Sequence, residues 1–281
     1  MFCPPPTGPA DRLPAPRARC VAGARVAGLT LFALLAISGC QGVAFPVPER
    51  VVDLTPPITP DAALQRLGGR VLEFLGTDGR ASSTPLLPKD AAMAFGLQSI
   101  HLLSHVGAHL DAGSRLLRGG EAPGQVPVDR IVGRARVVDL RWHNRHTAIQ
   151  ITDLELTPIE TGEIVLLLLG YEPPNTEEWP LYAPLSVQAA EYLVAKGIRA
   201  LATDLPTLAR FDDIDSRLHK RQPPEVVWAE YLPFFQNRIP IIAGLVNIDA
   251  IAREDKLVFA GLPLPLMQAT GAPVRAVALV Y

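Results

Sequence analysis

Short apolar runs recur through residues 50–281, and most of them predict β-strands. The run 166–169 is apolar without alternation, which is typical of a strand buried on both faces. Residues 76–92 and 205–223 predict loops. Strands are expected at residues 51–55, 135–140, 147–152, 164–169, 198–203, 239–245, 256–259 and 273–280.

Helical spacing of apolar residues is clearest at 186–196, where Ser186 is an N-cap and Gly197 a stop signal. Residues 61–74 and 224–235 also predict helices, although two adjacent glycines at 68–69 weaken the first. A helix at 186–196 between two strands indicates an α/β unit. The simplest assignment is one α/β domain over residues 50–281.

The amino terminus has the pattern of a secretory signal. Arg25 precedes an apolar run over residues 26–37, which is too short to span a membrane and is followed by small residues and Cys40. The sequence I-S-G-C ending at Cys40 resembles the lipobox of bacterial lipoproteins, whose cysteine is lipidated. We therefore expect a signal peptide at 1–39, a lipidated Cys40, a tether at 40–49, and attachment to the bacterial cell envelope. Gln41 favours the outer membrane.

Composition narrows the function classes without selecting one. The formal net charge is −2, and nothing in the charge pattern indicates a nucleic-acid partner, although arginines give residues 115–145 a basic character. Cys3 and Cys20 precede the expected cleavage site, so the mature chain would form no internal disulfide. The sequence contains no glycine-rich phosphate loop, nucleophile-elbow serine or paired-cysteine metal motif.

The stretch 104–111 carries the candidate chemistry. If residues 96–111 are extended, side chains alternate, and His105, His109 and Asp111 lie on one face. A helix would point Asp111 away, about 200° further round. Two imidazoles and a carboxylate suit one divalent ion such as zinc or manganese. The alternative is that the histidines are only hydrogen-bonded within a polar patch.

Residues 105–115, which read H-V-G-A-H-L-D-A-G-S-R, resemble the signature H-x-G-T-H-x-D-x-P-x-H of the cyclase family. This family of metal-dependent hydrolases includes bacterial kynurenine formamidase (arylformamidase) and isatin hydrolase. The resemblance extends over residues 50–281. It implies a mixed β-sheet with flanking helices, a homo-oligomer, a small-molecule substrate, and hydrolysis of amide-like bonds, with a metal held by residues matching His105, His109 and Asp111.

The chain departs from this family at three functional positions. Arg115 replaces the acid/base histidine, and an arginine cannot accept a proton at neutral pH. By the resemblance, Tyr231 and Ala243 replace the histidine and glutamate of a second metal, so only one ion is expected.

Two hypotheses follow from these departures. The first is a divergent hydrolase, arylformamidase-like and by resemblance linked to tryptophan catabolism, in which Arg115 binds an anionic substrate group. The second is a catalytically degenerate, lipid-anchored binding or scaffold protein of the cell envelope.

Overall fold

The computed structural model describes residues 46–87, 96–173 and 177–281. The expected signal peptide and Cys40 lie outside these residues. Within the described part of the chain, no helix is long and apolar enough to cross a membrane. Residues 46–281 form one compact unit, which holds all the elements described below.

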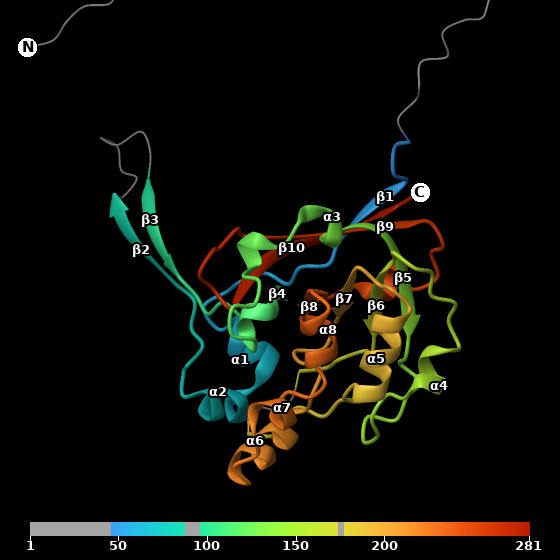
Figure 1. The fold of residues 1–281 in the computed structure, drawn as a ribbon. Helices are drawn as coiled ribbons and strands as arrows, with labels where there is room; N and C mark the ends of the chain where they lie inside the picture. Colours follow the sequence, from blue (N-terminus) through green and yellow to red (C-terminus); the bar gives the residue numbers. More distant parts are fainter. Residues whose placement is uncertain (1–45, 88–95, 174–176) are drawn as a thin grey trace, which may run out of the picture. The chain divides into compact units, whose positions relative to one another are not determined.

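A mixed β-sheet forms the centre of this unit (Figure 1). Its order is β1-β10-β4-β8-β7-β6-β5-β9, and β9 also pairs with β10, so seven of its eight strands close into a barrel. The β5–β6, β6–β7 and β7–β8 pairs are parallel and the others antiparallel. The strands are β1 (Arg50–Asp53), β4 (His109–Asp111), β5 (Val132–Asp139), β6 (Ile164–Leu168), β7 (Ala200–Thr203), β8 (Ile241–Ala243), β9 (Leu257–Pro263) and β10 (Gly271–Val280).

Helices cover the outside of the parallel strands, and α5 and α8 lie over β6 to β8 (Figure 1). A separate two-stranded sheet, β2 (Ser82–Leu87) with β3 (Leu97–His101), extends from the barrel (Figure 1). The α-helices are α1 (Ala62–Leu67), α2 (Gly69–Leu75), α3 (Val128–Ile131), α4 (Ile151–Leu154), α5 (Val187–Ala195), α6 (Phe211–His219), α7 (Pro224–Val227) and α8 (Leu232–Gln236). Single 3-10 turns are η1 (Gly113–Arg115), η2 (Pro123–Gln125) and η3 (Ile248–Ile251).

Strand β6 is apolar without alternation because both its faces are packed against other parts of the protein. Leu166 belongs to the cluster that contains Leu110 and Phe259, on one face of the sheet. Leu167 belongs to the cluster that contains Leu193, from the covering helix α5. Both faces of the strand are therefore buried, which confirms the sequence prediction and the α/β class with its mixed sheet.

Helix α5 also follows the sequence prediction closely. Ser186 Oγ accepts a hydrogen bond from the Ala189 N–H at 3.1 Å, and the helix ends before Gly197, which has a φ of +72°. The glycine pair at 68–69 divides the predicted helix 61–74 into α1 and α2, because Gly68 has a φ of +79°.

Several sequence predictions were wrong. Residues 147–152 form a single bridge at Ile149 and the start of α4, not a strand. Strand β2 lies within the predicted loop 76–92, and α6 lies within the predicted loop 205–223. Helix α6 was not predicted because it buries only Phe211 and Ile214, and its other residues are polar apart from the exposed Leu218. The predicted helix 224–235 divides into α7 and α8.

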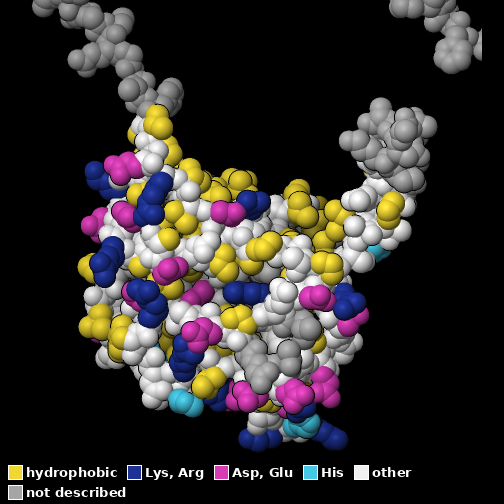
Figure 2. Space-filling view, turned by 180° about the vertical axis from the view of Figure 1, so that it is seen from behind, with side chains coloured by type: hydrophobic (Ala, Val, Ile, Leu, Met, Phe, Trp, Pro, Cys, Tyr) yellow, Lys and Arg dark blue, Asp and Glu magenta, His cyan; other side chains and the backbone are white. Residues whose placement is uncertain are grey.

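The arginines of residues 115–145 do not form a free basic surface. Acidic and basic side chains are interspersed on the face seen in Figure 2. Most of these arginines have a carboxylate partner, which neutralises the basic character that the sequence shows. The pairs outside the candidate site are Arg130–Glu121, Arg134–Glu160, Arg136–Asp255, Arg141–Asp139 and Arg145–Glu172.

Candidate metal centre

The candidate metal ligands come from β4 and from the turn before it. His109 and Asp111 are two residues apart on β4 and lie on one face, as the alternation predicts. The expectation of one extended segment over 96–111 was wrong, because the chain leaves β3 and turns before β4 begins. Gly107, with a φ of +65°, forms part of this turn and brings His105 back toward the strand.

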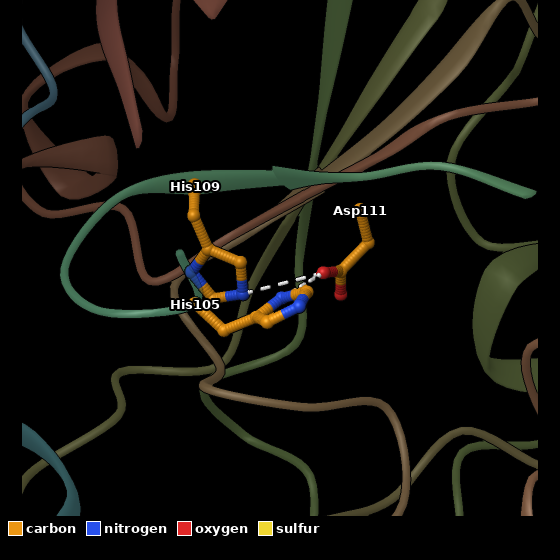
Figure 3. Close-up of side chains that lie close together, drawn as sticks. All are labelled: His105, His109 and Asp111. Atoms are coloured by element: carbon orange, nitrogen blue, oxygen red, sulfur yellow. Dashed lines mark hydrogen bonds and ion pairs between the residues drawn. The ribbon is translucent and has the colours of Figure 1, made fainter. Parts of the chain in front are cut away.

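The three side chains converge despite this turn (Figure 3). One potential ligand atom from each lies within 4.8 Å of the others. His105 Nδ1 is 2.7 Å from Asp111 Oδ1, and His109 Nε2 is 3.6 Å from the same oxygen. The imidazole rings are perpendicular, with centroids 5.3 Å apart. The structure therefore brings together all three residues that the sequence selected.

Each imidazole is oriented by a contact on its other nitrogen. His109 Nδ1–H donates to the Gly107 carbonyl at 2.9 Å, and this leaves Nε2 as the nitrogen that faces Asp111. His105 Nε2 lies 3.0 Å from Thr270 Oγ1, immediately before β10. A Cβ at Gly271 would lie 2.3 Å from the His105 ring, so only glycine leaves room for the imidazole there.

His109 is neutral and Asp111 is ionised at pH 7, for different physical reasons. The His109 side chain is almost fully buried, and burial lowers its pKa to about 4, so the imidazole is neutral at pH 7. Burial alone would raise the pKa of Asp111, but the positive charge of Arg115 and the neighbouring imidazoles outweigh it and hold that pKa well below its usual range. A neutral imidazole and an ionised carboxylate are the forms that bind metal ions.

The surroundings of His109 Nε2 indicate whether the site fits an ion. This atom is buried and has no hydrogen-bond partner among the residues that the structure describes. A buried nitrogen without a partner is costly in a structural histidine, whereas a metal ion would satisfy it. The donor set of two imidazoles and one carboxylate therefore suits a divalent transition ion, as the sequence predicted.

Arg115 is part of this cluster, in a role that sequence reasoning missed. Its Nη1 donates to Asp111 Oδ2 and lies 3.2 Å from His105 Nδ1. The guanidinium also packs over the rings of Trp228 and Tyr231. The pair forms because the chain turns from β4 into η1 (Gly113–Arg115), which no local pattern in the sequence indicates, and nothing in the sequence pointed to Trp228 either.

The two positions assigned to a lost second metal lie beside the same cluster. Ala243 on β8 is the cross-strand partner of His109. Tyr231 is fully buried next to Arg115. The neighbouring Glu230 is occupied elsewhere, because both its carboxylate oxygens accept hydrogen bonds from Arg217, at 2.7 and 2.9 Å.

A cavity of about 300 Å³ opens onto the cluster. Its wall is mostly apolar, and His105, His109 and Arg115 are the ionisable side chains among its lining residues. The apolar lining includes Leu67, Phe74, Leu103, Phe211 and Trp228. A cavity of this size suits a small molecule with an apolar body and one polar end.

A closed mixed barrel with a His-His-Asp cluster at a cavity wall defines a class of α/β protein with a candidate metal site. The family model described as putative cyclase matches residues 52–210, and the chain belongs to this family. The matched segment contains the metal cluster and Arg115, but not Tyr231 or Ala243.

Known proteins with similar sequences include kynurenine formamidases. The enzyme of Bacillus cereus is 30% identical over 190 residues, which cover 67% of this chain and 82% of that protein. The enzyme of Salinibacter ruber is 27% identical over 182 residues, which cover 64% of this chain and 78% of that protein.

Solved structures agree on the fold. Isatin hydrolase A of Ralstonia solanacearum has a TM-score of 0.63 at 17% identity, covering 83% of this chain and 92% of that one. A potential metal-dependent hydrolase with cyclase activity has a TM-score of 0.59 at 20% identity, covering 83% and 98%. At these identities the likeness shows a shared fold alone.

Proposed function

We propose that this protein hydrolyses an amide-like C–N bond of a small molecule with the help of one divalent ion, zinc or manganese. His105, His109 and Asp111 would hold the ion. The observation that carries the proposal is the buried Nε2 of His109, which faces the carboxylate at the wall of the cavity and has no hydrogen-bond partner among the described residues. Sequence similarity to kynurenine formamidases supports the reaction class.

The ion, the apolar wall and Arg115 would have different roles in the reaction. A bound ion would supply Lewis acidity and lower the pKa of water. The apolar wall holds the body of the substrate and excludes solvent. Arg115 has donors only, so it can stabilise a developing negative charge or a substrate carboxylate but cannot take a proton. Loss of a general base typically lowers a rate by about 10²–10⁴-fold, so we expect slow turnover.

We also propose that lipid on Cys40 anchors the domain to the bacterial envelope, with the outer membrane favoured. The support is the sequence around Arg25 and Cys40. Replacing Cys40 by alanine and fractionating the cells tests it, since protein that stays in the membrane fraction would contradict the anchor. A homo-oligomer, implied by the resemblance, remains a prediction.

Metal content and turnover, measured on one preparation, test the hydrolase proposal. We expect one divalent ion per chain, and hydrolysis of N-formylkynurenine or isatin that a chelator abolishes and added zinc or manganese restores. The variant His109→Ala should lose the ion. His219→Ala is the matched control, because His219 lies on α6 with its side chain 77% exposed.

Each result has a defined meaning. An ion retained at full occupancy in His109→Ala would refute the metal site. A chain that binds an ion but turns over neither compound would favour the alternative, a degenerate binding or scaffold protein of the envelope.

A further inference from the structure

The guanidinium of Arg115 is a permanent positive charge placed against the metal ligands. Its Nη1 donates to Asp111 Oδ2, and its side chain is only 15% exposed. Burial opposes this charge, but the Asp111 carboxylate more than compensates and raises the pKa of Arg115 above its ordinary value. The guanidinium is therefore charged at neutral pH.

Two aromatic rings confine this guanidinium. Arg115 Cζ lies 5.3 Å from the ring centroid of Tyr231 and 5.6 Å from that of Trp228. The Tyr231 ring is itself held, because its hydroxyl accepts the Leu208 N–H at 3.0 Å. Turning Arg115 toward solvent would break both ring contacts and leave Asp111 Oδ2 without its cation.

The two oxygens of Asp111 are thus committed to different partners. Oδ1 faces His105 Nδ1 and His109 Nε2, whereas Oδ2 is bound by Arg115. An ion on Oδ1 alone would leave Oδ2 as a buried charged oxygen with no partner, which is unfavourable. The guanidinium satisfies Oδ2, so this oxygen is not available to a second cation.

The two positions assigned to the lost second metal carry neither an imidazole nor a carboxylate. The methyl group of Ala243 lies on β8 beside His109, and a phenol ring, that of Tyr231, lies over the guanidinium. Within the part of the chain that the structure describes, only one group of three His, Cys, Asp or Glu side chains has convergent ligand atoms, and it consists of His105, His109 and Asp111.

We propose that Arg115 is a positioning residue that replaces a second cation. It holds Asp111 with Oδ1 toward the imidazoles and limits the site to a single divalent ion. This inference rests on the proposed metal site and adds its stoichiometry and its internal charge balance.

The first test counts ions in the full chain, stripped with chelator, reloaded with Zn²⁺ or separately Mn²⁺, and dialysed. Wild type and Arg115→Lys should each hold one ion by elemental analysis. The triple variant Arg115→His, Tyr231→His, Ala243→Glu removes the fixed cation and adds two imidazoles and a carboxylate beside the cluster, so it should hold two. A wild type with two ions, or a folded triple variant with one, overturns the proposal.

The second test uses one substitution and does not depend on the triple variant. Arg115→Met keeps much of the side-chain volume but removes the charge, so affinity for Zn²⁺ in calorimetric titration should fall about tenfold, as for other residues that orient a ligand. Arg115→Lys should recover most of that loss. Unchanged affinity in Arg115→Met overturns the proposal.

The outcomes also separate this inference from the proposed function. A wild type that binds no ion refutes both. A wild type with one ion, an unaffected Arg115→Met and a triple variant that still holds one ion refute only the role of Arg115 and leave the hydrolase proposal standing.

Discussion

Two buried aspartates, Asp111 and Asp204, use the same side chain in opposite ways. Asp204 follows β7, and its carboxylate accepts the backbone N–H groups of residues 169–171 at 2.7–3.1 Å. Asp111 is bound by side chains instead, with His105 on one oxygen and Arg115 on the other. Burial raises the pKa of Asp204, whereas the positive charge of Arg115 helps to lower the pKa of Asp111 despite burial.

The partners of each carboxylate determine whether it is available to a ligand. Backbone N–H groups can only donate, so they fill the lone pairs of Asp204 and fix the loop after β6. Imidazole nitrogens also carry lone pairs, and His109 Nε2, which has no hydrogen-bond partner in the described part of the chain, leaves a lone pair beside Asp111 that an ion would satisfy. Burial alone does not distinguish the two residues, because both are nearly inaccessible.

A matched pair of isosteric variants sets these two carboxylates directly against each other. Asp111→Asn should lower zinc affinity at least about 100-fold, because it removes an anionic ligand. Asp204→Asn should leave the ion in place but lower the free energy of unfolding by about 1–3 kcal/mol, because the amide NH2 group, which can only donate, would replace an oxygen that accepts the Leu169 N–H. Zinc titration and urea unfolding measure the two effects.

The comparison fails if the effects do not separate. Loss of zinc from a folded Asp204→Asn would mean that the loop after β6 shapes the metal site. Unchanged zinc affinity in Asp111→Asn would remove the carboxylate from the ligand set.

Local signals in the sequence were enough to predict the strands and helix nearest the barrel centre. The apolar run of β6 and the Ser186 and Gly197 signals of α5 act within a few residues, so they could be read directly. Barrel closure could not, because the β9–β10 pair is selected by packing among strands that are distant along the chain. The end of β7 at Thr203 was also predicted, but not the hydrogen bonds that Asp204 accepts from the loop after β6.

The candidate site was predicted in part for a similar reason. His109 and Asp111 share a face because β4 is a strand, as the alternation requires. His105 joins them through a turn at Gly107, so its inclusion was right while the geometric reason was wrong. The pairing of Arg115 with Asp111 was not predicted, because Arg115 was expected to bind an anionic substrate group.

His109, beside Asp111, and Asp204 should give the metal-free chain opposite pH dependences of stability. The pKa of His109 is lowered from 6.5 to about 4, so the unfolded state binds the proton first as the pH falls. The contribution of His109 to the free energy of unfolding is fully present above pH 6.5. It should fall by about 3 kcal/mol by pH 4. The raised pKa of Asp204 acts the other way, because its contribution is lost as the pH rises from 3.8.

Urea unfolding of the metal-free protein between pH 4 and 7.5 measures this dependence, and His109→Gln should flatten most of it. Gln is the suitable control because it keeps a polar side chain but does not titrate. An equally steep profile in His109→Gln would assign the dependence to other groups.

The smallest expected effect concerns the orientation of one ligand. With an ion on Nδ1, His105 would carry its proton on Nε2 and donate it to Thr270 Oγ1, which would hold the ring with Nδ1 toward Asp111 Oδ1. Thr270→Val removes the acceptor and should weaken zinc binding about tenfold, whereas Thr270→Ser keeps the hydroxyl and should bind as wild type does. Equal affinity in all three proteins would show that packing against Gly271 alone orients His105, because the glycine leaves the ring no other position.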